Sequence, residues 1–164
     1  MNKPKVGIIM GSISDRAITE KGAALLRELE VPFEMTVASA HRTPDRVREY
    51  TLSARERGIE VLIAGAGWAA HLAGVLASLT ELPIIAVPIG SSPFQGLDAL
   101  LASVQMPPGV PVAVMAVDGA KNAGIFAVQI LALKDPALRE RLLAFRRRQA
   151  EEVLEKAKEL EQTA

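Results

Sequence analysis

The sequence predicts an α/β fold, a three-layer sandwich built on a five-stranded parallel sheet with a long C-terminal helix. Five short apolar runs alternate with segments of helical pattern. The runs are continuously apolar rather than alternating, which is typical of strands covered on both faces. At 164 residues the chain is long enough to bury a core alone. We therefore expect a single domain over residues 1–164, with a helical arm over about 136–160.

The first strand is predicted over 5–10 (KVGIIM), and a helix is predicted over about 16–29. The polar turn 11–15 (GSISD) joins them. Its glycine and serines offer N–H groups and hydroxyls where a helix dipole favours an anion. The turn is therefore a candidate phosphate site.

Asp15 complicates this interpretation because a carboxylate repels a phosphate. We resolve the conflict by assigning Ser12, Ser14 and the backbone to a phosphate, and Asp15 to neutral hydroxyls such as those of a ribose. The alternative is that Ser14 or Asp15 only caps the helix. The residues alone leave both interpretations open.

The second strand is predicted over 33–37, and a charged helix over 44–57. Between them lies the loop 39–44 (SAHRTP), which contains one of the two histidines of the chain. Histidine takes and gives a proton near neutral pH, and arginine offers a fixed fork of donors for phosphate or carboxylate. Thr43 as N-cap and Pro44 at the first helical position explain the helix start. They leave His41 and Arg42 as candidates for proton transfer and anion binding.

The third strand is predicted over 61–64, and it opens into 65–72 (GAGWAAHL). The third glycine of a dinucleotide-binding fingerprint does not follow at the needed spacing, which argues against NAD. Small residues here instead let the backbone approach a ligand and leave a narrow, mostly apolar space. His71 lies near the start of the next helix, where a packing role is at least as well supported as a catalytic one.

The second half of the chain supplies the remaining elements, with strands predicted over 82–88 and 112–117 and helices over 97–104, 122–133 and 136–160. The helix over 122–133 is apolar almost all round, which a domain of this size does not easily bury. We therefore expect it to pack in a subunit interface. Asp135 and Pro136 give the last helix an N-cap and a first-turn proline.

Alternating strands and helices imply right-handed crossovers and a parallel sheet, for which the flavodoxin-like order 2-1-3-4-5 is favoured. In that order the loops after the first three strands emerge together at the switch point of the sheet, where open α/β sheets bind ligands. These loops carry 12–15, 39–42 and 65–71. Three segments noticed independently are thus predicted to form one site.

Composition narrows the possible partners. The formal net charge is zero and the pI is about 6.8, so there is no excess of basic residues for nucleic acid or an anionic membrane. The absence of cysteine excludes disulfides and thiolate chemistry and suits the cytoplasm, which is the location we expect. No apolar run approaches the roughly 20 residues that span a bilayer. A small molecule is the expected ligand.

Four segments together resemble the bacterial class I PurE family, the N5-carboxyaminoimidazole ribonucleotide mutases of purine biosynthesis. They are 10–15 (MGSISD), 39–44 (SAHRTP), 64–72 (AGAGWAAHL) and 104–107 (VQMP). The resemblance extends over nearly the whole chain. It implies an enzyme without cofactor or metal that moves a carboxylate from N5 to C4 of an aminoimidazole ribonucleotide. The octamers of the family imply a homo-oligomer, with eight copies expected.

The resemblance also implies roles for individual residues. His41 is expected to be the general acid and base, and Arg42 to bind the phosphate of the ribonucleotide. Ser12, Asp15 and Ser39 complete the expected substrate-binding set. The residues expected to line the pocket are Ser14, Gly65, Ala66, Gly67, Ala70 and His71.

This chain departs from the family pattern at several positions around the expected pocket. Trp68 and Ala73 stand where a small residue and a proline are usual, and Arg16 replaces a frequent tryptophan. Residues 92–95 (SPFQ) also differ from the usual loop of small residues. These positions affect the shape of the pocket rather than its chemistry.

Three alternatives to the mutase remain open at this point. The first is the class II activity, direct carboxylation of aminoimidazole ribonucleotide by CO2, although an arginine rather than a lysine after Ser-Ala-His favours the mutase. The second is a nucleotide-binding module without catalysis, which leaves His41 unexplained. A purely structural assembly protein leaves three polar loops at one edge unexplained.

Overall fold

The structure, a computed structural model, describes residues 3–163. Two compact units, 1–127 and 128–164, divide the chain; the single domain with an arm over about 136–160 stays a prediction. In order, the elements are β1 (Val6–Met10), a 3₁₀ turn (Ile13–Asp15), α1 (Arg16–Glu28), β2 (Phe33–Val37), α2 (Pro44–Arg57), β3 (Val61–Gly67), α3 (Leu72–Leu79), β4 (Ile84–Ile89), α4 (Leu97–Val104), β5 (Ala113–Val114), α5 (Ala120–Ala132) and α6 (Pro136–Thr163).

The five strands form one parallel sheet in the order β2-β1-β3-β4-β5, which confirms the predicted flavodoxin-like topology. β1 lies in the middle of the first three strands. Its last residue, Met10, pairs with Val37 of β2 and with Gly65 of β3. The loops after β1 and β2 therefore leave the sheet side by side at its carboxyl edge, next to the last residues of β3.

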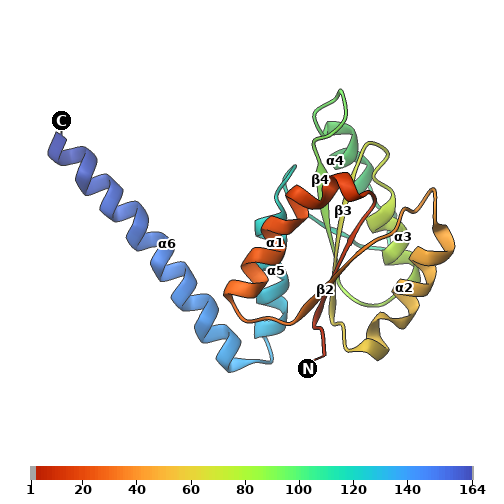
Figure 1. Ribbon diagram of the computed structural model, residues 1–164, viewed down its shortest axis with the longest axis horizontal. Helices are drawn as coiled ribbons and strands as arrows, with labels where there is room; N and C mark the ends of the chain where they lie inside the picture. The colour runs from red at the N-terminus through yellow and green to blue at the C-terminus, as the bar shows by residue number, and fades with distance from the viewer. Residues whose placement is uncertain (1–2, 164) are drawn as a thin grey trace. The chain divides into compact units, whose positions relative to one another are not determined.

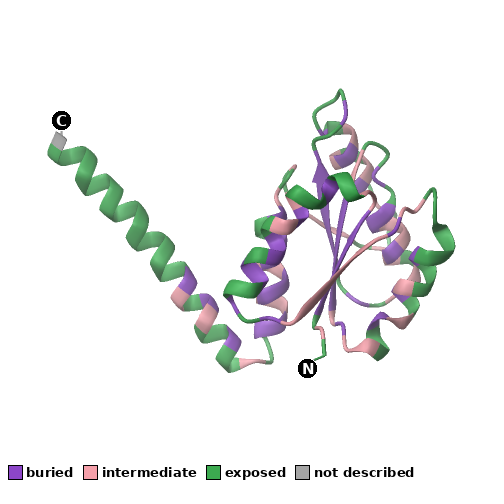
Figure 2. Ribbon diagram, in the orientation of Figure 1, coloured by how far each residue is buried: buried purple, intermediate pink, exposed green. Residues whose placement is uncertain are grey.

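Helices cover both faces of the sheet (Figure 1). α1 and the first turns of α5 lie on one face, and α2 and α3 lie on the other. Burial follows this arrangement, since β1 and β4 are buried throughout whereas every residue of β2 is half-buried (Figure 2). The core on the α2 and α3 side includes Ile9, Val47, Leu62, Leu76 and Ile84. Continuous apolar runs are required because both faces of these strands meet helices.

β1 and β4 are each one residue shorter than predicted, and β3 and β5 differ more. β3 runs on through Gly67, because Ala66 and Gly67 pair with Pro88 and Ile89 of β4. β5 has only two residues in place of the predicted 112–117. Gly65 and Gly67, which were predicted to lie in a loop after the third strand, are thus the end of β3 itself.

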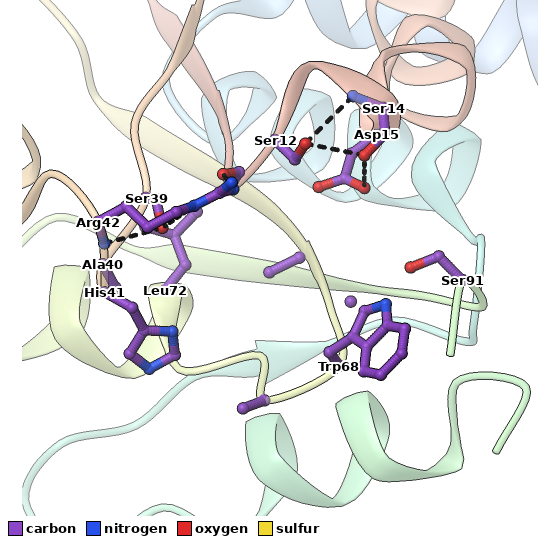
Figure 3. Close-up of a pocket in the computed structure, with 14 residues that line it drawn as sticks. Ser12, Ser14, Asp15, Ser39, Ala40, His41, Arg42, Trp68, Leu72 and Ser91 are labelled. Carbon is purple, nitrogen blue, oxygen red and sulfur yellow. Dashed lines mark hydrogen bonds between the residues drawn. The ribbon is translucent and has the colours of Figure 1, made fainter. Parts of the chain in front are cut away.

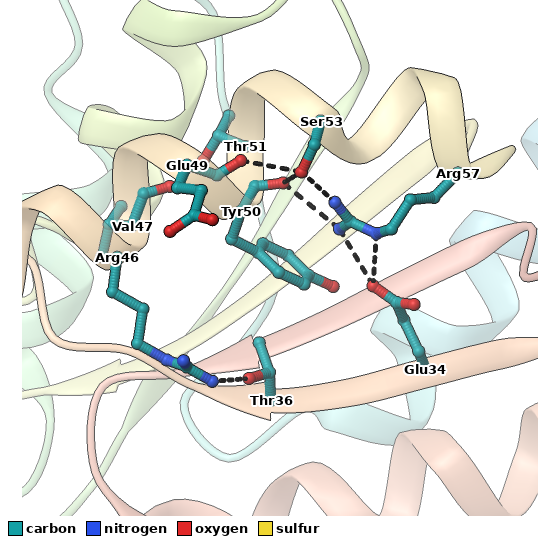
Figure 4. Close-up of polar contacts among 9 residues, drawn as sticks. All are labelled: Glu34, Thr36, Arg46, Val47, Glu49, Tyr50, Thr51, Ser53 and Arg57. Carbon is teal, nitrogen blue, oxygen red and sulfur yellow. Dashed lines mark hydrogen bonds and ion pairs between the residues drawn. The ribbon is translucent and has the colours of Figure 1, made fainter.

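Two arginines of α2 tie this helix to the edge strand β2 (Figure 4). Arg57 Nε and Nη2 lie 3.2 Å and 3.0 Å from Oε1 of Glu34, and the guanidinium stacks 4.5 Å from the centre of the Tyr50 ring. At the other end of α2, Arg46 donates to the carbonyl of Val37 and the hydroxyl of Thr36. These contacts fix both ends of α2 relative to β2, and so constrain the loop 38–43 between them.

The last two helices fit the predicted pattern of caps and apolar faces. Oδ1 of Asp135 accepts a hydrogen bond of 2.9 Å from the Leu138 amide, which confirms the predicted N-cap of α6. In α5, Ala120, Ala123 and Ala127 are buried within the unit that holds the sheet. The first turns of this helix are thus already covered, and its place in a subunit interface stays a prediction. Among residues 3–163, no helix is both long and apolar enough to cross a membrane.

Candidate active site

A cavity of about 590 Å³ lies at the carboxyl edge of the sheet, over the ends of β1, β2 and β3 (Figure 3). The three predicted loops therefore do meet at one place. The residues around the cavity are small, polar or charged, apart from one aromatic side chain and one leucine. They are Gly11, Ser12, Ser14, Asp15, Ser39, Ala40, His41, Arg42, Ala66, Gly67, Trp68, Ala69, Leu72 and Ser91.

The turn after β1 presents hydroxyls and one carboxylate to the cavity. Ser12 caps the 3₁₀ turn, with its Oγ 3.4 Å from the Ser14 amide and 2.9 Å from the Ser14 hydroxyl. Asp15 stands at the N-cap position of α1, but its side chain makes no capping hydrogen bond. The capping side chain is therefore that of Ser12, where the alternative interpretation named Ser14 or Asp15, and the carboxylate of Asp15 lines the cavity without capping α1.

Asp15 is the buried charged side chain of this cavity, with 5% of its surface exposed. Burial raises the pKa of its carboxyl above the ordinary value of 3.8, against the smaller opposing effects of hydrogen bonds from Ser12 and Ser14 and of the positive charge of Arg42. The folded protein consequently holds a proton here more readily than the unfolded chain does. The stability contributed by this group falls as the pH rises from 3.8 through the raised pKa.

We expect Asp15→Asn to unfold at a higher urea concentration than the wild type at pH 7, because the variant buries no carboxylate. The difference should disappear as the pH falls below 3.8. A ligand that donates hydrogen bonds to this carboxylate should bind the same variant about tenfold more weakly, since the variant loses the charged acceptor. Urea unfolding at several pH values and ligand titration measure the two effects.

Asp45→Asn is the matched control for this prediction. Asp45 is exposed in the first turn of α2, where its charge is favourable to the helix dipole. This substitution should not stabilise the protein at pH 7. Equal stabilisation by both substitutions would contradict the assignment of a burial cost to Asp15.

The loop after β2 holds Arg42 in a fixed orientation. Its amide donates to the Ser39 hydroxyl (3.2 Å), its Nε lies 3.4 Å from the same oxygen, and Nη2 donates to the Gly11 carbonyl (3.1 Å). The guanidinium therefore bridges the ends of β1 and β2. A second cavity of about 370 Å³ shares Arg42 and is also lined by Arg46.

Thr43 occupies the predicted N-cap position of α2 but makes no capping hydrogen bond with its side chain. Its hydroxyl instead accepts from the Ser39 amide (2.9 Å) and lies 3.2 Å from the Ser39 carbonyl, to which it donates. Ser39 is thus held through its backbone while its hydroxyl faces Arg42. Thr43 shapes the site loop rather than the helix end.

The two histidines of the chain contact each other, and His41 lines the cavity next to Arg42. Nε2 of His41 lies 2.9 Å from Nδ1 of His71, and the rings are nearly perpendicular at 79° with centroids 5.0 Å apart. His71 is the N-cap residue of α3. One ring nitrogen of this pair donates and the other accepts, so the proton position of His41 is linked to His71. His71 is hydrogen-bonded, as a packing histidine would be, but its side chain is exposed and its partner is His41.

The predicted pocket residues at the end of β3 differ in their position along the strand. Ala66 and Gly67, the last two residues of β3, line the cavity, whereas Gly65 does not. A Cβ at Gly65 would lie 2.6 Å from the Thr19 methyl group of α1, so this glycine serves the packing of α1 on the sheet. Ala70 is buried and His71 stands behind His41, so neither lines the cavity.

Several lining residues were not predicted as site residues, namely Gly11, Ala40, Trp68, Ala69, Leu72 and Ser91. Ser91 belongs to the long loop after β4, and long loops in compact domains often carry function. In residues 3–163, no group of three or more His, Asp or Glu side chains is placed to hold a metal ion.

Fold and site together define a doubly wound α/β protein whose switch-point cavity is lined by an arginine and a histidine. Residues 5–152 match the family model described as AIR carboxylase. The chain belongs to this family.

Relatives and solved structures agree with this assignment. The chain is 55% identical to the N5-carboxyaminoimidazole ribonucleotide mutase of Pyrococcus horikoshii, over 98% of this chain and 90% of that protein. It is 54% identical to the mutase of Thermotoga maritima, over 97% and 93% of the two chains. A crystal structure of Treponema denticola PurE superposes with a TM-score of 0.86 at 28% identity, over 96% of this chain and 98% of that chain.

Proposed function

We propose that this protein is an N5-carboxyaminoimidazole ribonucleotide mutase, which converts N5-carboxyaminoimidazole ribonucleotide to 4-carboxyaminoimidazole ribonucleotide in purine biosynthesis. The observation that carries the proposal is the position of His41, exposed at the cavity beside Arg42 and hydrogen-bonded to His71. Relatives with 54% and 55% identity bear the name of this enzyme. The class I reaction is therefore favoured over direct carboxylation.

Each part of the substrate has side chains of suitable chemistry in the loops around the cavity. Arg42, with Ser12 and Ser39, offers a cation and hydroxyl groups to the phosphate. Asp15 accepts hydrogen bonds from the ribose hydroxyls. The side chains of Ala40, Ala66 and Ala69 leave a small apolar space for the carboxylate that migrates. Arg42 and Asp15 line the same cavity, which supports the assignment of one to the phosphate and the other to the ribose of a single bound nucleotide.

The reaction needs one group that gives and takes a proton. Protonation of N5 by His41 weakens the N5–C bond of the carbamate, which breaks to release CO2 and leaves an electron-rich aminoimidazole. C4 then attacks the same CO2, and His41 removes the proton from C4 as aromaticity returns. The cavity must hold neutral CO2 close to C4 between the two steps, which is a contribution of proximity. Neither step requires a metal ion or a nucleotide triphosphate.

His71 acts through His41 and is a positioning residue. We expect His71→Leu to lower kcat about tenfold and to leave KM within about twofold, because the ring of His41 loses the partner that orients it. His71→Asn should recover most of kcat, since its amide places a polar atom near the position of Nδ1. A fall in kcat that is equal for both variants would contradict the positioning role.

The assay that tests the function starts from the reaction product. Pure protein is incubated with 4-carboxyaminoimidazole ribonucleotide without bicarbonate or ATP, and the ultraviolet absorbance is followed. Formation of the N5-carboxylated nucleotide supports the mutase, whereas direct release of CO2 to leave aminoimidazole ribonucleotide would indicate the direct carboxylase running in reverse. A protein that binds the nucleotide and never turns it over would instead be a binding module.

A homo-oligomer of eight copies, located in the cytoplasm, completes the proposal. Apolar side chains at Leu97, Leu101 and Val104 repeat along one face of α4 and are about half exposed. Such a stripe is typical of a helix that a partner surface covers. Sedimentation at equilibrium measures the number of copies directly.

A further inference from the structure

Trp68 is the single tryptophan of the chain, and it stands at the mouth of the cavity. The side chain is 58% exposed, although tryptophan is among the side chains that gain most from burial. Figure 3 shows the indole on the side of the cavity formed by the end of β3, apart from Ser12, Asp15 and Arg42. A large aromatic surface is thus presented to a cavity and not to the core.

The backbone of Trp68 adds a second observation. Its φ is 55°, in the left-handed region that bulky side chains rarely adopt. The carbonyl of Trp68 accepts a hydrogen bond of 2.9 Å from the Ala70 amide, so a tight turn imposes this conformation. Glycine satisfies the same turn at lower cost. The fold therefore gains little from tryptophan here, and strain of this kind points to a functional role.

The other residues that line the cavity indicate which role an aromatic side chain has here. Apart from the His41 ring, which transfers protons, Trp68 is the only aromatic side chain among the lining residues. The remaining walls are serine, alanine, glycine, leucine and two charged groups, none of which offers a flat apolar plane. A ligand with an electron-rich heteroaromatic ring therefore has one surface on which to stack.

We propose that the indole of Trp68 stacks on the aminoimidazole ring of the substrate and determines the preference of this enzyme for a nucleotide with a heteroaromatic ring. The inference rests on the proposed function for the identity of that ring. Stacking on an aromatic side chain strengthens binding of a base by about tenfold or more. The contact holds the plane of the ring while the carboxylate moves from N5 to C4.

Two ligands distinguish stacking from general damage to the site. 4-Carboxyaminoimidazole ribonucleotide carries the ring, whereas ribose 5-phosphate has the phosphate and sugar alone. Trp68→Leu should raise KM for the first about tenfold and leave the inhibition constant of the second unchanged within about twofold. Trp68→Phe, which keeps an aromatic plane, should stay within about threefold of the wild-type KM.

Fluorescence and stability supply independent readouts. Because Trp68 is the single tryptophan, its emission should change when the ring-bearing nucleotide is added and hardly change with ribose 5-phosphate. Trp68→Gly should have a Tm no lower than the wild type, since glycine relieves the turn, and yet bind the ring-bearing nucleotide about tenfold more weakly. Phe94→Leu is the matched control, because Phe94 is 70% exposed and does not line the cavity.

Two results would overturn the stacking role. One is a Trp68→Leu enzyme with the wild-type KM, and the other is equal weakening of both ligands. Failure of the proposed function is a separate result, because it is seen as a wild-type protein that does not interconvert the nucleotides. The fluorescence and binding measurements still test stacking in that case, since they require no turnover.

Discussion

Replacement of His41 by asparagine is expected to reduce the interconversion of the two carboxylated nucleotides by about a thousandfold. General acid and base catalysis contributes on the order of 10² to 10⁴ to a rate, and here one side chain serves both half-reactions. Asparagine is similar in size and keeps a polar group toward His71, so the loops should keep their positions. The single-turnover rate, followed by ultraviolet absorbance, measures the loss.

Binding separates this result from a damaged site. His41→Asn should bind 4-carboxyaminoimidazole ribonucleotide within about threefold of the wild type, because the phosphate and ribose contacts belong to other residues. His71→Leu is the matched variant at the partner ring. Its loss of kcat should be much smaller than the loss of rate in His41→Asn. A His41→Asn enzyme with more than a tenth of the wild-type rate would show that another group transfers the proton.

Replacement of Gly22 by valine is expected to lower the free energy of unfolding by about 3 kcal/mol. Gly22 lies on α1 where this helix meets the start of α5, and a Cβ there would be 2.7 Å from the Ala120 carbonyl oxygen. That oxygen belongs to the backbone and cannot rotate away. The close approach continues at Gly124, whose added Cβ would lie 3.0 Å from the Gly22 carbonyl. Urea unfolding followed by circular dichroism measures the change.

Ala24→Val is the control on the same helix. Ala24 is exposed, so valine there costs only its lower helix propensity, about 0.5 kcal/mol. If Gly22→Val lost no more stability than Ala24→Val, the contact between α1 and α5 would not restrict this position, since valine is a better helix former than the glycine it replaces.

The order of the strands was predictable because it rests on strong, repeated signals. Each buried strand is a continuous apolar run, and each is followed by a helix with a recognisable start. Strand ends were less predictable, since they depend on pairing partners. Gly65 and Gly67 are poor strand formers in isolation, but β4 supplies the hydrogen bonds that keep them in β3.

The short β5 has a similar explanation. Its predicted range continues to residue 117, and the Asp118 amide still donates to the Pro88 carbonyl. Pro88 has no amide hydrogen to give in return, so the ladder between β4 and β5 is interrupted. The sequence contains this proline, but the register that places it opposite β5 comes only from the folded sheet.

The candidate site was predictable where residues follow strand ends and unpredictable where contacts join distant segments. Ser12, Asp15, Ser39 and Arg42 lie together because the switch point brings their loops together. The contact between His41 and His71 joins residues 30 apart in the sequence, and a sequence does not show which way two rings turn. For the same reason it did not separate Gly65, which packs against Thr19 of α1, from Ala66 and Gly67, which line the cavity.

Met10 pairs with both neighbouring strands, so the loops that form the site keep their positions only while the central strands stay paired. The loop after β1 and the loop after β2 begin one residue beyond that row of pairs, so neither keeps its position if β1 leaves the sheet. A molecule that holds the nucleotide is therefore one whose central strands are intact. By mass action, the nucleotide should protect the entire sheet against unfolding in proportion to its saturation of the site. Cells rich in this intermediate would then keep the enzyme longer, because its unfolded form is the one that proteases degrade.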